Sequence, residues 1–187
     1  MDAAALLRPD LLDGCVVALG GGDSPLGPPL VALGAATSSL PAALDEDTLA
    51  AAVNPSTDVL VHDLRRAFAG GRGDAALRAT LDLAWVTVRA VANAAFIPEA
   101  RGGKVVLIAP PPDDADVAAA GVRAGAENLA RTLSIEWARH GITTVAITPG
   151  GDTAEEEITA LAAFLASPAG DYYSGCRLAL GELAVTA

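Results

Sequence analysis

Four short runs of apolar residues constrain the fold of this chain more than any other feature of its sequence. They cover residues 15–20, 58–64, 104–110 and 143–150, and turn-forming residues bound them. Apolar runs of this length, without polar alternation, are typical of strands that are buried on both faces of a sheet. We therefore expect four buried strands at these positions.

Helical patterns separate these runs. One long helix is expected over residues 74–100 and another over residues 118–140, where Gly141 is placed to act as a C-cap. Apolar residues recur in the second helix at the three- and four-residue spacing of one buried face, namely Val122, Ala126, Leu129, Leu133 and Trp137. Strands that alternate with helices over short loops predict a doubly wound α/β fold, a parallel sheet with helices on both faces. We expect one such domain over residues 1–187.

The last third of the chain is expected to add one helix and one strand. Thr153 and Glu156 have capping-box spacing, so the helix should begin near Thr153 and end near Ser167. The acidic triplet at residues 155–157 fits a helix start better than a metal site, because carboxylates are favoured at that end of the helix dipole. A closing strand is expected over residues 176–183.

Charge and composition exclude several classes of partner. The net charge is −11 and no cluster of basic residues offsets it, so binding to nucleic acid is not expected. No apolar run approaches the ~18 residues of a membrane span. The two cysteines, Cys15 and Cys176, lack metal-ligand spacing and are interpreted as core thiols. The N-terminus does not have the pattern of a signal peptide, and we expect a cytoplasmic protein.

A longer pattern resembles a known family. Residues 123–150 read RAGAENLARTLSIEWARHGITTVAITPG, similar to the long helix, strand and Pro-Gly turn of the short-chain dehydrogenases/reductases. The segments VVALGGGDSPLG (16–27), DVLVHDL (58–64) and KVVLIAP (104–110) resemble that family's first, fourth and fifth strands, and EEITALAAFLASPAGDYYSGCRLAL (156–180) its last helix and strand. These segments follow one another in the same order as in the family, over nearly the whole chain. The resemblance implies a Rossmann-like domain and, if any cofactor, NAD(P).

The departures from the family fall on its catalytic residues. The resemblance places Ala119 at the position of the family's catalytic tyrosine and Arg123 at that of its lysine. Pro110 stands at the serine position, and Thr80 or Asp82 at the asparagine position, depending on the register. An alanine has no proton to donate, and a proline offers neither a hydroxyl nor a backbone N–H. We therefore expect no catalytic residues and no hydride transfer.

The cofactor loop departs from the family as well. Gly21 and Gly27 align with the outer glycines of the family's loop, but Pro25 stands where the backbone must approach a pyrophosphate closely. The pair Pro28-Pro29 removes N–H groups that would otherwise face a phosphate. These losses predict that no dinucleotide is bound.

Two stretches are shorter than in the family. Between residues 27 and 58 there is room for one weak strand near residues 36–40 and one helix near residues 45–53, so this edge of the sheet is expected to be reduced. The chain passes from Pro149-Gly150 almost directly into the last helix, without the family's substrate lid. His62 and His140 are interpreted as a strand-end and a helix-end residue rather than as catalysts.

Three functions remain open at this point. The first is a non-catalytic subunit that assembles with itself or with a catalytically intact paralogue, because the elements retained are those through which the family oligomerises. The residues expected at its interfaces are Trp85, Val88, Leu129, Leu133, Trp137, Leu178 and Leu180. The second is a working NAD(P)-dependent oxidoreductase with Arg123, Asp82 and Tyr172 as substitutes. The third is a protein that binds acyl-CoA or another small ligand beyond the carboxyl ends of the strands.

Overall fold

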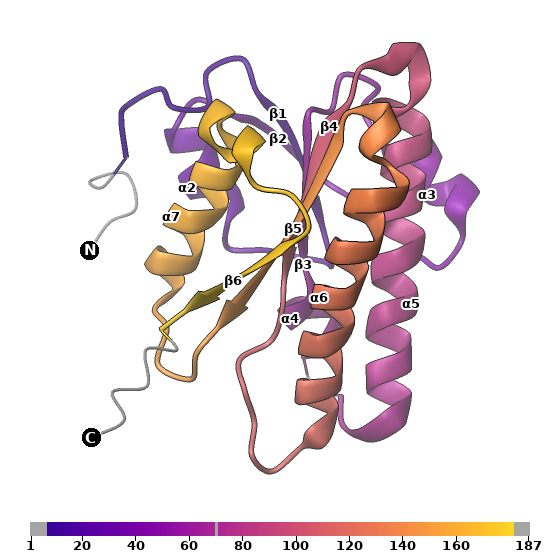
Figure 1. The fold of residues 1–187 in the computed structure, drawn as a ribbon, viewed down its shortest axis with the longest axis vertical. Coiled ribbons are helices and arrows are strands. Elements are labelled where there is room, and N and C mark those ends of the chain that lie inside the picture. Colours follow the sequence, from indigo (N-terminus) through magenta and orange to yellow (C-terminus); the bar gives the residue numbers. More distant parts are fainter. Residues whose placement is uncertain (1–6, 70, 182–187) are drawn as a thin grey trace.

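The computed structural model describes residues 7–69 and 71–181, and a parallel sheet of six strands lies at its centre (Figure 1). The strand order is β2-β1-β3-β4-β5-β6, and every neighbouring pair is parallel. The strands are β1 Val16–Gly20, β2 Ala36–Ser39, β3 Val59–Asp63, β4 Gly103–Ile108, β5 Ile142–Pro149 and β6 Cys176–Leu180. The four predicted buried strands, the weak edge strand and the closing strand are all present.

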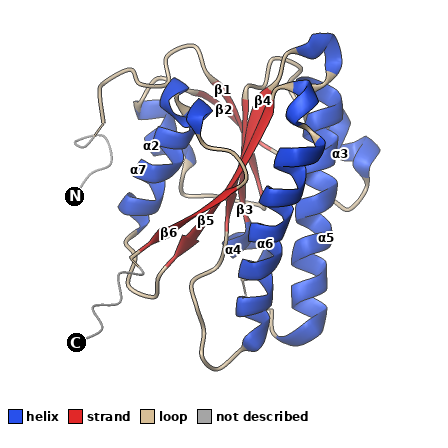
Figure 2. Ribbon diagram, in the orientation of Figure 1, coloured by secondary structure: helices blue, strands red, loops and turns tan. Residues whose placement is uncertain are grey.

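Helices cover both faces of the sheet (Figure 2). They are α2 Gly27–Ala32, α3 Glu46–Ala52, α4 Leu64–Phe68, α5 Gly73–Val91, α6 Val117–Glu136 and α7 Glu155–Ala166. Helices α2 and α7 lie on one face, and α3, α5 and α6 lie on the other (Figure 1). The doubly wound α/β fold is therefore confirmed.

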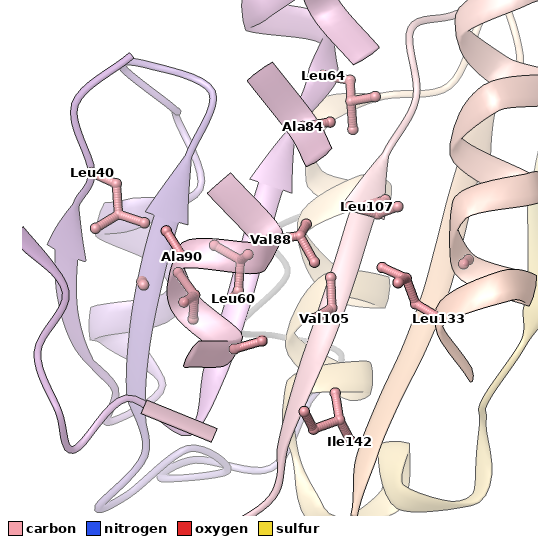
Figure 3. Close-up of a cluster of buried hydrophobic side chains, with 14 of the residues drawn as sticks. Leu40, Leu60, Leu64, Ala84, Val88, Ala90, Val105, Leu107, Leu133 and Ile142 are labelled. Atoms are coloured by element: carbon pink, nitrogen blue, oxygen red, sulfur yellow. The ribbon is translucent and has the colours of Figure 1, made fainter. Parts of the chain in front are cut away.

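Each face of the sheet has its own hydrophobic core, because successive residues of a strand point to opposite faces. Leu60 of β3 packs with Val88 of α5 and Leu107 of β4 in the core beneath α5 and α6 (Figure 3). Val59 and Val61 of the same strand pack in the other core, beneath α2 and α7. Burial on both faces explains why the strands appear in the sequence as unbroken apolar runs.

The two long helices end in distorted turns. Helix α5 ends at Val91, and a π-helical turn (Ala92–Phe96) and a 3₁₀ turn (Pro98–Ala100) complete the segment that the sequence predicts as helical. Helix α6 ends at Glu136 and continues as a 3₁₀ turn to His140. Gly141 then adopts a left-handed conformation with φ 68°, which confirms the predicted C-cap.

The predicted capping box at Thr153 and Glu156 is wrong by one residue. Helix α7 begins at Glu155, and the backbone N–H of Ala154 donates to Glu157 Oε2 at 3.0 Å. The Thr153 hydroxyl instead accepts from the Gly150 N–H at 2.8 Å and donates to the Leu180 carbonyl at 2.9 Å. Thr153 thus joins the end of β5 to the end of β6. The predicted closing strand ends at Leu180, and its residues 182–183 lie outside the described part of the chain.

Candidate functional site

The strand order places a candidate site at the carboxyl ends of β1 and β3. The chain leaves β1 toward β2 on one side and then returns to β3 on the other, so β1 and β3 flank a topological switch point. Ligands of open parallel sheets bind in the crevice outside the carboxyl ends at such a point. In this chain that position, called the crevice below, is bounded by the loop at residues 21–26, the end of β3 at Asp63 and the short connection from β5 to α7 at residues 150–154.

Two glycines beside the loop after β1, Gly21 and Gly27, pack closely within the chain. Gly21 has φ 97°, and a Cβ atom on it would lie 2.3 Å from the carbonyl oxygen of Asp63. A Cβ on Gly27 would lie 3.3 Å from Leu19 Cδ1. Pro28 and Pro29 occupy the first turn of α2, as predicted, so this turn lacks two N–H groups that would otherwise be free to bind an anion. The start of the loop thus lies against the end of β3 at Asp63.

Replacing Gly21 with alanine should therefore destabilise the protein even in the absence of any ligand. A left-handed residue with a Cβ costs about 1–2 kcal/mol, and the contact with the Asp63 carbonyl adds about 1–3 kcal/mol of overpacking. Gly22 is the matched control, since it has φ 105° but a Cβ on it would have no atom within 4 Å. Urea denaturation of the two alanine variants measures the difference. Equal losses for both would contradict the packing explanation of Gly21.

Arg65 lies across the crevice and is held by two carboxylates. Its Nε and Nη2 atoms donate to the two oxygens of Asp63, each at 2.8 Å. Its Nη1 and Nη2 atoms donate to the two oxygens of Glu155 in the first turn of α7, again at 2.8 Å. The Asp63 side chain is fully buried, and it also accepts from the Ser24 hydroxyl at 3.3 Å. One guanidinium thus joins the end of β3 to α7 and, through Asp63, to the loop after β1.

The electrostatics of Arg65 favour its charged form. Burial alone would lower the pKa of Arg65, but the hydrogen bonds and charges of Asp63 and Glu155 outweigh burial and raise this pKa above its ordinary value. Sequence reasoning did not identify Arg65 or Glu155 as site residues, since 90 positions separate them in the chain. The signal that could have found them is the position of Asp63 and Arg65 directly after a buried strand.

The structure shows the surroundings of the residues that the resemblance places at the family's catalytic positions. Ala119 is 1% exposed, and Pro110 is buried at the end of β4. The Arg123 Nη1 atom donates to the carbonyl oxygens of Pro110 at 2.8 Å and Pro149 at 2.6 Å. Arg123 therefore joins the carboxyl ends of β4 and β5. The predicted cation is present, and its Nη1 atom contacts two backbone carbonyls.

The other candidates for catalysis are dispersed. Thr80 of α5 is 1% exposed and faces the sheet, whereas Asp82 of the same helix is exposed to solvent. Tyr172 is 92% exposed and follows α7, at the opposite edge of the sheet, so the hypothesis that it substitutes for the family's tyrosine is wrong on geometry. Tyr173 packs edge-on against Phe164, with ring centroids 5.8 Å apart. None of these side chains adds a proton donor to the crevice.

His62 is buried beneath the crevice rather than exposed in it. It is fully buried in β3, and neither ring nitrogen has a hydrogen-bond partner within residues 7–69 and 71–181. Burial lowers the pKa of His62 to about 4, against a small opposing effect of the Asp63 charge. A Cβ on Gly20 would lie 2.3 Å from His62 Nδ1, so this glycine makes room for the imidazole. His62 is neutral at pH 7 and is a core residue.

Two of the predicted interface residues belong to the core. Val88 is fully buried and Leu133 is 3% exposed, because both point toward the sheet beneath their helices. Their assignment to an interface is therefore wrong. The remaining five are at least partly accessible, with Trp85 the most exposed at 39%. These five are Trp85, Leu129, Trp137, Leu178 and Leu180.

A large hollow opens at the opposite, amino edge of the sheet. Its volume is about 1260 Å³, and it is lined by the segments before β1, β3 and β4 and by the end of α7. Cys15 borders it, and burial, with a contribution from Asp58, raises the pKa of the Cys15 thiol to about 11. Lys104 also borders it and donates to the carbonyls of Ala166 and Ser167 at the end of α7. A ligand-sized space thus lies away from the predicted crevice.

The residues around the crevice do not fit a dinucleotide. The loop after β1 rests on Asp63, and carboxylates engage the guanidinium of Arg65 on two sides. Within the described ranges, no three His, Cys, Asp or Glu side chains gather into a metal site, and no helix is long and apolar enough to cross a membrane. The arrangement holds the end of β3 and the start of α7 together through Arg65.

Comparison with known proteins identifies the fold. No family model matches the sequence, and no curated protein is a significant match. Among solved structures, a citronellol catabolism dehydrogenase of Pseudomonas aeruginosa matches with a TM-score of 0.74 and 21% identity over 94% of this chain and 96% of that chain. A short chain dehydrogenase from Mycobacterium smegmatis matches with a TM-score of 0.72 and 20% identity, over 95% and 96% of the two chains.

A third match is an enoyl-acyl carrier protein reductase of Bacillus cereus, solved with NADP+, with a TM-score of 0.68 and 15% identity over 91% of this chain and 96% of that chain. Identities at this level reflect a shared fold. The architecture agrees with the resemblance in the sequence, in which the same elements follow one another in the same order. This chain has the Rossmann-like fold of the short-chain dehydrogenases/reductases.

Proposed function

We propose that this chain is a non-catalytic protein of the short-chain dehydrogenase/reductase fold, which acts as a structural or regulatory subunit. Its partners would be further copies of itself or a catalytically intact protein of the same fold. One observation carries the proposal. Arg123, which the resemblance places at the position of the family's catalytic lysine, donates to the backbone carbonyls of Pro110 and Pro149 and so joins the carboxyl ends of β4 and β5.

The charge around the crevice supports the loss of cofactor binding. The loops after β4 and β5 and the start of α7 carry exposed carboxylates, namely Asp113, Asp114, Asp152, Glu156 and Glu157. These carboxylates create a negative potential at the mouth of the crevice, and a dinucleotide carries at least two negative charges of its own. The repulsion adds to the steric and hydrogen-bonding obstacles within the crevice.

We expect that the purified protein neither binds nor turns over a nicotinamide cofactor. Titration with NADH and NADPH should give no saturable fluorescence change, and standard alcohol and ketone substrates should give no turnover. The double variant Ala119→Tyr/Arg123→Lys should stay inactive, because the crevice is altered at several other points and such groups act as a unit. Consumption of NADPH by either protein would contradict the proposal, since it requires a working cofactor site.

The outer surface of α5 and α6 supports the assembly part of the proposal. Trp85 of α5 is 39% exposed, and the Arg89 guanidinium lies 5.7 Å from the centre of its ring. On α6, Val117 is 84% exposed and Ile135 is 77% exposed. Trp and Arg are enriched among the residues that dominate binding energy at protein interfaces. Exposed apolar residues of this size on neighbouring helices are consistent with a surface that a partner covers.

The Trp85→Ala variant tests this surface. Light scattering is expected to show an oligomer for the natural sequence, and the variant should weaken the assembly by about 10-fold or more, as removal of an interface anchor does. Tyr172→Ala is the matched control, because it removes an exposed aromatic side chain outside α5 and α6. A natural chain that stays monomeric, alone and with candidate paralogues, would contradict the proposal.

The hollow at the amino edge favours a second candidate function, the binding of a small ligand. Its volume of about 1260 Å³ is ample for a small molecule, and both apolar and charged side chains line it. The sequence predicts such a ligand at the carboxyl edge of the sheet, whereas the hollow lies at the amino edge. Thermal shift with acyl-CoA thioesters tests this candidate, since a ligand at 100 times its dissociation constant stabilises a protein by about 2.7 kcal/mol.

A further inference from the structure

The contacts of Arg65 leave it little capacity for an anionic ligand. Four of its N–H···O contacts go to two carboxylates, two to Asp63 and two to Glu155, and all four are 2.8 Å long. A guanidinium has five N–H donors, and paired contacts of this kind are the same ones by which arginine binds phosphate. The carboxylates of this chain therefore occupy the donors that a phosphate group would use.

The contacts of Arg65 matter because they lie where ligands of this kind of fold bind. Ser24 of the loop after β1, Asp63 and Arg65 after β3, and Glu155 of α7 form a continuous polar chain. The chain spans the crevice at the switch point of the sheet, where ligands of such folds bind. An anion entering the crevice would meet Arg65 and would have to displace one of its two carboxylates.

The two carboxylates differ in how firmly they are held. Asp63 is fully buried, caps α4 through the Arg65 backbone N–H at 3.1 Å, and also accepts from Ser24. The Glu155 side chain is 43% exposed and makes its contacts with Arg65 alone among the hydrogen bonds of the described residues. Displacing Glu155 leaves the pair between Asp63 and Arg65 intact, so Glu155 is the displaceable partner.

We propose that Glu155 is a built-in anion that holds the crevice closed: its carboxylate takes the place of a phosphate group at Arg65 and fastens α7 to the end of β3. The inference rests on the proposed function, in which the crevice no longer serves a dinucleotide. It adds that the crevice keeps an anion-binding group whose ligand is now part of the chain. Removing the Glu155 carboxylate should then make the site receptive to a free anion.

The experiment compares Glu155→Ala with Glu156→Ala, using inorganic pyrophosphate as the probe at constant ionic strength. Glu156 is the matched control, because it lies in the same helical turn and carries the same charge but has no contact with Arg65 among the described hydrogen bonds. Glu155→Ala should melt at most about 2–4 °C below the natural chain, because an ion pair this exposed contributes up to about 1 kcal/mol. Millimolar pyrophosphate should raise the melting temperature of Glu155→Ala again. The natural chain and Glu156→Ala should not respond. Amide hydrogen exchange at residues 155–158 should be faster in Glu155→Ala and slow again with pyrophosphate.

Equal responses of all three proteins to pyrophosphate, or no response of a folded Glu155→Ala, would overturn the inference. Glu155→Gln is the second variant if the alanine variant does not fold, since it keeps the side-chain length and removes only the charge. Failure of this inference and failure of the proposed function give different results. Binding of NADPH by the natural chain would refute the proposed function, whereas the pyrophosphate response of the variants decides the role of Glu155.

Discussion

Replacing Arg65 with alanine is expected to lower the free energy of unfolding by about 3–5 kcal/mol, the usual cost of removing one partner of a buried ion pair. The reason is the fully buried carboxylate of Asp63, which would keep the Ser24 hydroxyl and one backbone N–H but lose its counter-ion. The contact with Glu155 adds little, because that carboxylate is 43% exposed to water. At about 2–4 °C per kcal/mol for a chain of this size, the melting temperature should fall by about 10 °C.

Two comparisons isolate the cause of this loss. Arg66→Ala removes the neighbouring arginine, which is exposed, and should change stability by less than about 0.5 kcal/mol. The double variant Asp63→Asn/Arg65→Ala should be more stable than Arg65→Ala alone, because it no longer buries an uncompensated charge. Denaturation of the natural chain, Asp63→Asn, Arg65→Ala and the double variant measures the coupling between Asp63 and Arg65. If the free energy of unfolding of Arg65→Ala lies within about 1 kcal/mol of that of the natural chain, the Asp63 carboxylate does not depend on Arg65 as its counter-ion, and the prediction is wrong.

Acid is expected to destabilise the protein through His62. The pKa of His62 is lowered from 6.5 to about 4 by burial, so between these values the unfolded chain binds a proton that the folded chain does not. The stability contributed by the neutral imidazole is complete above pH 6.5 and is lost as the pH falls toward 4. A difference of about 2.5 pH units at 1.36 kcal/mol per unit corresponds to about 3 kcal/mol.

A difference measurement separates His62 from the carboxylates that titrate in the same range. The free energy of unfolding of the natural chain, measured from about pH 7 to about pH 4, should fall by about 3 kcal/mol more than that of His62→Asn, which has no group to protonate at this position. His140→Asn is the control, because it makes the same substitution at the chain's other histidine, in the surface turn after α6. Parallel curves for the natural chain and His62→Asn would contradict the prediction.

The sequence by itself determined the layers of this protein. Burial on both faces requires unbroken apolar strands, and the runs at residues 58–64, 104–110 and 143–150 match β3, β4 and β5 to within two residues at each end. The same local signals located α6 and its glycine C-cap. These features are decided by neighbouring residues along the chain, through strand burial, helical periodicity and the conformational freedom of Gly141.

The sequence did not predict what covers the apolar face of each helix. Only the three-dimensional structure shows this. Helical spacing shows that Val88 and Leu133 share a face with other apolar residues, but it does not say whether a sheet or another molecule covers that face. In the structure the sheet covers them, and Trp85 remains accessible. The helix start at Glu155 was likewise decided by Thr153, whose hydroxyl serves the ends of β5 and β6.

The state of the crevice was decided by contacts between distant parts of the chain. The resemblance places Ala119, Arg123 and Pro110 at the family's catalytic positions, which predicts the loss of chemistry but not the contacts that these residues make. Arg123 meets the carbonyls at the ends of β4 and β5, and Arg65 meets Glu155, only because parallel strands bring their carboxyl ends to one edge of the sheet. The type of each residue is a local property, whereas its partners follow from the order of the strands, and the order is fixed by packing over the whole chain.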